Sequence, residues 1–121
     1  QKPWLPLTEA YRALAISEQE KDPQSLLNFY RDLLAWRKGQ SVLLHGDQAL
    51  LPAHKQVMAF VREHEGKKIL CAFNFSDSAA TMDLPATFKS ASVLPVPGLG
   101  GGSVVGESIQ LTTYGALLLA L

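Results

Sequence analysis

The sequence predicts a mainly β protein, an antiparallel β-sandwich that is preceded by an extended loop and one amphipathic α-helix. Residues 1–40 carry six basic and five acidic side chains, whereas residues 90–121 carry only Glu107, so the two ends belong to different kinds of structure. Residues 22–39 carry a full set of signals for the start and end of a helix. After Gly39, short apolar runs alternate with turn residues, as they do in strands.

The first segment, Gln1–Lys21, is predicted to be an extended loop that wraps over a surface. It contains Pro3 and Pro6 and has no clean periodicity up to about Ala13. Trp4 lies in this loop next to the prolines. Because an aromatic face can stack on a sugar ring or on another planar ligand, Trp4 is a candidate ligand-contacting residue of the segment.

The helix is predicted over Pro23–Lys38. Asp22 is in the position of an N-cap, Pro23 occupies the first helical position, and Gly39 follows two basic residues at the end. Large apolar side chains form a stripe wider than that of a helix with one face in solvent (Leu26, Leu27, Phe29, Tyr30, Leu33, Leu34 and Trp36). We therefore expect this helix to be buried on more than one side.

The strands are short, and the clearest pair is Val57–Glu63 with Lys68–Phe75. Gly66 lies between them and tolerates the positive φ that a tight hairpin turn requires. Closely spaced strands need antiparallel connections, and about seven of them are typical of a sandwich. Pro95–Gly106 is rich in glycine and is predicted to be a flexible surface loop. The other candidate strands are Gln48–Leu51, Ala80–Leu84, Ser90–Leu94, Ser108–Leu111 and Tyr114–Leu121.

Length and composition exclude several classes of function. With 121 residues, the chain is too short for a (β/α)₈ barrel, which needs roughly 200 residues. Eleven basic and eleven acidic side chains give a net charge of 11 − 11 = 0, which argues against a nucleic-acid or anionic-lipid partner. The sequence contains no window of about 18 apolar residues, so it predicts no membrane-spanning segment. The single Cys71 excludes an internal disulfide and a zinc site with several thiolates.

Motifs for phosphate or metal binding are incomplete. The glycine run of Gly98 and residues 100–102 is followed by Ser103 without the lysine and helix of a phosphate-binding loop, and we interpret it as a mobile loop. The three histidines are nine and ten residues apart and lack a metal-binding spacing (His45, His54 and His64). We predict no catalytic residue, no metal site and no cofactor within this chain.

The remaining reactive residue types have structural interpretations. Cys71 lies in an apolar strand, so we expect its thiol to pack in the core. Asn74 starts a glycosylation sequon, but it more simply ends a strand and forms a turn through side-chain hydrogen bonds. Acids near the helix start are expected in a solvated loop (Glu18, Glu20 and Asp22), and Asp22 already has the capping role.

Four blocks of the sequence together resemble a known family. They are KPWLPLTEAYRALAISEQEKDPQSLLNFYRDLLAWRKG at the start, HGD, VMAFVREHEGKKILCAFNFS, and LTTYGALLLAL at the end. In this order they are similar to the carboxy-terminal portion of α-glucosidases of the α-amylase superfamily, glycoside hydrolase family 13. The first block favours the oligo-1,6-glucosidase-like branch, and the resemblance is weakest over residues 87–108.

The resemblance implies a division of the chain into two parts. Residues 1–45 would be the end of a catalytic (β/α)₈ barrel, with a loop and the final barrel helix. Residues 46–121 would be the C-terminal sandwich, the Greek-key-type domain C of the family. The family's three catalytic carboxylates precede this region and match no position here, so none is assigned. The chain begins with Gln1, and we take it to be an excised or processed piece.

The resemblance also implies the partners. The chain would stabilise the missing barrel of a retaining enzyme that hydrolyses or transfers terminal α-linked glucose, and it would meet oligosaccharides only through that enzyme, with Trp4 at the rim of the cleft. Without the barrel, the exposed helix face is expected to cause self-association. A cytoplasmic location is expected. The alternatives are a free-standing carbohydrate-binding module and a structural dimerisation domain. The aromatic side chains in or beside the predicted strands are expected to be covered, and this disfavours the carbohydrate-binding module.

Overall fold

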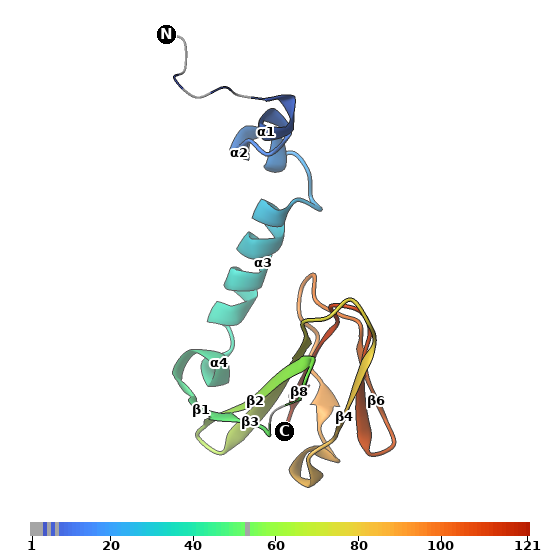
Figure 1. The fold of residues 1–121 in the computed structure, drawn as a ribbon. Coiled ribbons are helices and arrows are strands. Elements are labelled where there is room, and N and C mark those ends of the chain that lie inside the picture. The colour runs from blue at the N-terminus through green and yellow to red at the C-terminus, as the bar shows by residue number, and fades with distance from the viewer. Residues whose placement is uncertain (1–3, 5, 7, 53) are drawn as a thin grey trace.

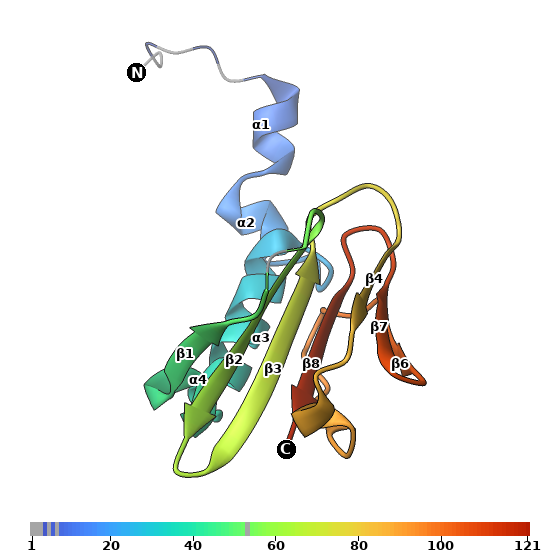
Figure 2. The same ribbon diagram turned by 60° about the horizontal axis from the view of Figure 1, so that its bottom comes forward.

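The computed structural model describes residues 4, 6, 8–52 and 54–121. Three layers follow one another in space: a helical layer, a five-stranded sheet and a three-stranded sheet (Figure 1). Figure 2 shows helices α3 and α4 across one face of the larger sheet. The described part of the chain contains no helix with the length and apolar character that spanning a membrane requires. The two antiparallel sheets, together with the main helix that precedes them, confirm the predicted β-sandwich.

The N-terminal segment differs from the predicted extended loop, because it forms two short helices, α1 (Glu9–Ala13) and α2 (Ile16–Gln19). Each is about one turn long, which is too short to produce a periodic apolar pattern. Neither helix buries a residue in the described structure, and both are held by local hydrogen bonds. The part of the loop prediction that concerns residues 1–3, 5 and 7 lies outside the described residues.

The main helix, α3 (Leu26–Lys38), starts three residues later than predicted. Its N-cap is Ser25, whose Oγ accepts a hydrogen bond from the Asn28 amide at 3.3 Å, so the assignment of Asp22 as N-cap was wrong. Ser25 rather than Asp22 is the N-cap because Ser25 is buried and its hydroxyl also donates to the Gln19 carbonyl oxygen at 2.7 Å. Asp22 instead accepts from the Gln24 amide at 2.8 Å, which closes the preceding turn. The helix ends at Gly39, as predicted.

A further helix that the sequence analysis did not predict, α4 (Ser41–His45), follows directly. Val42 and Leu43 of this helix are buried against the outer face of the larger sheet. Half-buried Trp36, at the end of α3, packs on the same cluster. The helical layer is thus fixed to the sheet through α4 and the last turn of α3.

The larger sheet has the strand order β1-β2-β3-β8-β5, and all its pairs are antiparallel. The predicted hairpin is confirmed: β2 and β3 pair from Val57 with Asn74 to His64 with Lys67. Glu65 and Gly66 form its two-residue turn with φ of 51° and 79°, as a tight primed turn requires. The strands span Asp47–Leu50 (β1), Val57–His64 (β2), Lys67–Asn74 (β3), Ser92–Val93 (β5) and Ala116–Ala120 (β8).

The smaller sheet has the order β4-β7-β6 and covers the inner face of the larger one. Its strands are β4 (Ala80–Asp83), β6 (Gly102–Val105) and β7 (Ser108–Leu111). Strand β6 lies inside Pro95–Gly106, so the prediction of a flexible loop over that whole range was wrong. A short 3₁₀ helix, η1 (Ala86–Phe88), follows β4 and buries Phe88.

The apolar core lies in two layers on either side of the larger sheet. Between the sheets, strands β3, β7 and β8 supply the most deeply buried side chains (Leu70, Ile109, Leu111 and Leu119). On the outer face, β3 and β8 supply a second cluster under the helices (Ile69, Cys71 and Leu118). The alternation of strand side chains explains this division, because consecutive residues of β3 and β8 point to opposite faces. Strands β3 and β8 are therefore apolar on both faces and read as continuous apolar runs.

Candidate functional site

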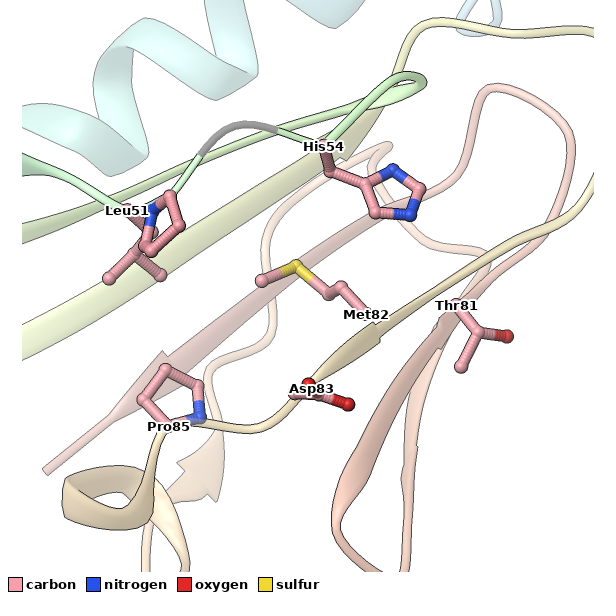
Figure 3. Close-up of a pocket in the computed structure, with 7 residues that line it drawn as sticks. Leu51, His54, Thr81, Met82, Asp83 and Pro85 are labelled. Carbon is pink, nitrogen blue, oxygen red and sulfur yellow. The ribbon is translucent and has the colours of Figure 1, made fainter.

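A pocket opens at the edge of the sandwich, between the segment after β1 and strand β4. It has a volume of about 460 Å³. In Figure 3, the Met82 side chain points into the space beside Leu51 and His54, whereas Thr81 and Asp83 point away from it. Leu51 and Met82 also pack on the core between the sheets. The pocket is therefore mainly an apolar opening into the core.

The polar groups of this pocket do not form a catalytic arrangement. His54 Nδ1 accepts a hydrogen bond from the Gln56 amide at 3.2 Å, within the same turn. No ion pair joins His54 and Asp83 in the described structure. Acid or base chemistry needs a second group that orients the imidazole, and the pocket does not supply one.

The histidines lie at two separate places. His45 and His64 approach each other with ring centroids 5.7 Å apart, and His64 lies 4.0 Å from the Glu65 carboxylate. His54 is at the pocket edge. Among residues 4, 6, 8–52 and 54–121, no three His, Cys, Asp or Glu side chains form a group that could hold a metal ion.

The acids near the start of α3 are solvated, as the sequence suggested. Glu18 pairs with Lys21 at 2.7 Å, and Glu20 pairs with Arg31 at 2.9 Å. Both pairs are exposed, so each contributes at most about 1 kcal/mol. Together with the turn bond of Asp22, these contacts explain the acids without a catalytic role.

Cys71 is buried in the outer-face cluster, which confirms its predicted place in the core. Burial raises the pKa of its thiol from the ordinary 9.0 to about 12, although the nearby Arg62 charge lowers it. The folded protein therefore holds a neutral, weakly nucleophilic thiol. Because the folded pKa is the higher one, ionisation favours the unfolded chain, and stability is lost as the pH rises from about 9 to about 12.

We expect the folded protein to react very slowly with the thiol reagent DTNB at pH 8, because Cys71 is both buried and protonated. The same chain in denaturing urea should react at the rate of a free thiol. The absorbance of the released thionitrobenzoate measures both rates. Rapid labelling of the folded chain would contradict this assignment.

Asn74 is a second buried group, and its side chain uses all of its hydrogen-bonding atoms. Nδ2 donates to the carbonyl oxygens of Ser78 and Thr112, at 2.7 and 2.8 Å. Oδ1 accepts from the amide and the hydroxyl of Ser76, at 3.0 and 2.7 Å. The predicted turn is confirmed for Asn74 and Ser76, and a glycan on this amide is incompatible with these bonds.

The aromatic side chains are more exposed than the sequence analysis expected. Trp4 is 91% exposed. Phe75 and Tyr114 are 70% and 67% exposed, so the expectation that the aromatics near strands are covered was wrong for these two. Phe75 directly follows β3, and Tyr114 lies in the turn between β7 and β8, where its backbone amide donates to the Ser76 carbonyl oxygen. Trp36 is half-buried and packs against the outer-face cluster.

A cleft between α3 and the outer face of the larger sheet was not anticipated. We call it the α3 cleft. It has a volume of about 310 Å³, and its lining includes Leu33, Trp36, Phe60 and Phe73 together with Arg37 and Arg62. A sequence signal existed for one of these residues, because Arg62 directly follows the apolar run of residues 57–61 and, two residues after Phe60, must share its face.

Comparison with known proteins places the chain in a family. The family described as "Maltogenic Amylase, C-terminal domain" matches residues 48–118. A probable α-glucosidase of Rhizobium meliloti (strain 1021) is 34% identical over 120 residues, which is 98% of this chain and 21% of the relative. Probable oligo-1,6-glucosidase 2 of Bacillus subtilis (strain 168) is 33% identical over 69% of this chain and 15% of that protein.

Solved structures agree with this placement. The crystal structure of the α-glucosyl transfer enzyme XgtA is 37% identical, with a TM-score of 0.88 over 98% of this chain and 22% of that one. The trehalulose synthase MutB is 22% identical, with a TM-score of 0.78, and supports the fold. The chain spans about a fifth of the length of these proteins. The chain belongs to the maltogenic amylase C-terminal domain family, and it corresponds to the non-catalytic C-terminal portion of α-glucosidase-like enzymes of the α-amylase superfamily, glycoside hydrolase family 13.

Proposed function

We propose that this chain acts within a longer retaining α-glucosidase, which hydrolyses or transfers terminal α-linked glucose from oligosaccharides. Its role there is to stabilise the catalytic barrel. The names of the relatives support this proposal, as does the scattered arrangement of acids and histidines in the described structure. The oligosaccharide would be bound by the longer protein rather than by this chain alone.

The observation that carries the proposal is the exposed side of α3. Leu26, Tyr30 and Leu34 are 65%, 53% and 51% exposed and lie one helical turn apart. We call these three residues the exposed stripe. The adjacent side of the helix, with Phe29, Leu33 and Trp36, is half-buried. A helix so apolar on two sides fits between two bodies, and only one of them, the sandwich, belongs to this chain.

Burial of the exposed stripe would contribute substantially to stability. Covering a large apolar side chain contributes about 1.5–3 kcal/mol when it is fully exposed at the start. Since the three side chains are already partly covered, their complete burial is worth roughly 3–5 kcal/mol. We infer that α3 is the final helix of the barrel, that residues 1–45 belong to the barrel and that residues 46–121 form the sandwich domain. Trp4 would then lie at the rim of the substrate cleft.

We expect Leu34→Glu to lower the thermal midpoint of the longer protein by several degrees, because it places a charge in the barrel contact. Differential scanning calorimetry and residual activity after heating measure the effect. Ala35→Glu is the matched control, since Ala35 is also exposed but lies on the polar side of α3 with Arg31. Equal effects of the two variants would contradict the proposal.

The same stripe predicts self-association of the 121-residue chain when it is free of the barrel. On gel filtration the apparent mass should rise with concentration, and Leu34→Glu should suppress this rise more than Ala35→Glu does. A strictly monomeric chain at high concentration would count against an adhesive stripe. We also infer a cytoplasmic location for the longer protein.

A further inference from the structure

Arg62, which lines the α3 cleft, carries a buried donor that lacks an acceptor. Arg62 Nε is fully buried, and no hydrogen-bond partner for it is found among the described residues. Leaving a buried donor of a charged group unpaired costs stability, so native structures usually supply a partner. The other residues that line the cleft are mostly apolar and come from α3 and from the outer face of the sheet.

The cleft also carries positive charge without a neighbouring acid. Arg37 lines it together with Arg62, and Arg37 Nη2 donates to the Leu43 carbonyl oxygen at 3.0 Å. Within the part of the chain that the structure describes, no carboxylate forms an ion pair with either arginine. Among the described residues that line the cleft, Cys71 is the only titratable group besides the arginines, and its thiol is protonated and neutral.

We propose that the α3 cleft is a binding site for a small organic carboxylate with an apolar body, whose carboxylate pairs with Arg62. A guanidinium presents its donors in a planar fork that matches a carboxylate, and such a pair is stronger than a bond between neutral groups. The rings of Trp36, Phe60 and Phe73 would pack on the apolar body of the ligand. The volume of about 310 Å³ suits a small molecule.

The chain offers its own reporter for this proposal. Trp4 and Trp36 are the two tryptophans, and only Trp36 lines the cleft. In a Trp4→Phe background, all tryptophan fluorescence of the full 121-residue chain therefore comes from the cleft. We expect 4-phenylbutyrate to change this fluorescence saturably, at about millimolar concentration or below. The NMR signal of the Arg62 Nε–H should shift in the same titration.

Three comparisons test the role of the charge. The neutral analogue 4-phenylbutyramide should bind at least about tenfold more weakly than the acid. Arg62→Met, which keeps an apolar stem, should weaken binding of the acid to a similar extent. Arg31→Met is the matched control, because Arg31 lies on the polar side of α3 and pairs with Glu20, and it should leave binding unchanged.

Several results would overturn the proposal. They are the absence of saturable binding by the acid, equal binding of acid and amide, and undiminished binding by Arg62→Met. If Arg62→Met fails to fold, two measurements on the protein that retains Arg62 decide the question. They are the comparison of acid and amide binding and the shift of the Arg62 Nε–H NMR signal. Binding by the 121-residue chain that disappears in the longer protein would also overturn it, since the cleft would then be filled by protein.

Discussion

The variant Asn74→Asp is expected to lose roughly 3–5 kcal/mol of stability at pH 7, because it replaces a buried donor by a buried charge. In the protein, Asn74 is 3% exposed, and its Nδ2 donates to the carbonyl oxygens of Ser78 and Thr112. A carboxylate oxygen at this position would face both acceptors and repel them. Since native proteins are stable by only about 5–15 kcal/mol, the loss should be evident in urea unfolding.

The loss should depend on pH in a defined direction. Burial and the two facing carbonyl oxygens favour the neutral carboxylic acid, so the pKa of Asp at this position would be raised in the folded state. Protonation then stabilises the folded variant, and its deficit relative to the parent should shrink as the pH falls from 7 towards about 4. Ser78→Ala is the control, because it keeps the carbonyl oxygen that Asn74 binds.

A stability deficit that stays constant between pH 4 and pH 7 would contradict the charge argument. A Ser78→Ala variant as unstable as Asn74→Asp would contradict the role of the Asn74 amide.

The hydrogen bonds of the Asn74 side chain matter for the fold because they join three segments. Asn74 ends β3, Ser78 precedes β4, and Thr112 precedes β8. A single side chain therefore fixes the loops at one end of both sheets.

The sequence predicted those elements whose signals are local. The β2–β3 hairpin followed from two apolar runs around Gly66, and the end of α3 followed from two basic residues before Gly39. The start of α3 was misjudged because two capping residues compete within four positions. Ser25 prevails over Asp22 through its bond to the Gln19 carbonyl oxygen, and such a tertiary contact is not visible in the local pattern.

The candidate sites show the same limit. Cys71 and Asn74 were placed correctly because an apolar strand and a turn motif determine their surroundings. The α3 cleft was missed because it forms where side chains of α3 meet Phe60 and Arg62 of β2, which are far away in the sequence. The position of Arg62, at the end of an apolar run and two residues after Phe60, was the one available signal. Its neighbours could only be known once the helix was placed on the sheet.

Strand β6 was missed because the glycines at its start are typical of a flexible loop. One of these glycines, Gly102, is now expected to be important for the stability of the chain. Gly102→Ala is expected to destabilise the chain by about 3 kcal/mol. An added Cβ at Gly102 would lie 2.5 Å from Leu117 Cβ and 2.9 Å from the Ala116 carbonyl oxygen. The carbonyl oxygen is part of the β8 backbone and the Leu117 Cβ is bonded directly to it, so neither can move without disturbing the pairing of β8 with β3.

Gly100→Ala tests this explanation within the same run of glycines. A Cβ at Gly100 meets no atom within 4 Å, and its backbone is outside the left-handed region, so the variant should lie within about 0.5 kcal/mol of the parent or be slightly more stable. Urea unfolding of both variants measures the difference. If the two substitutions cost the same, the glycines serve flexibility, as the sequence alone suggested. If only Gly102→Ala is destabilising, glycine is needed there because β6 packs closely against β8, and not because the segment is mobile.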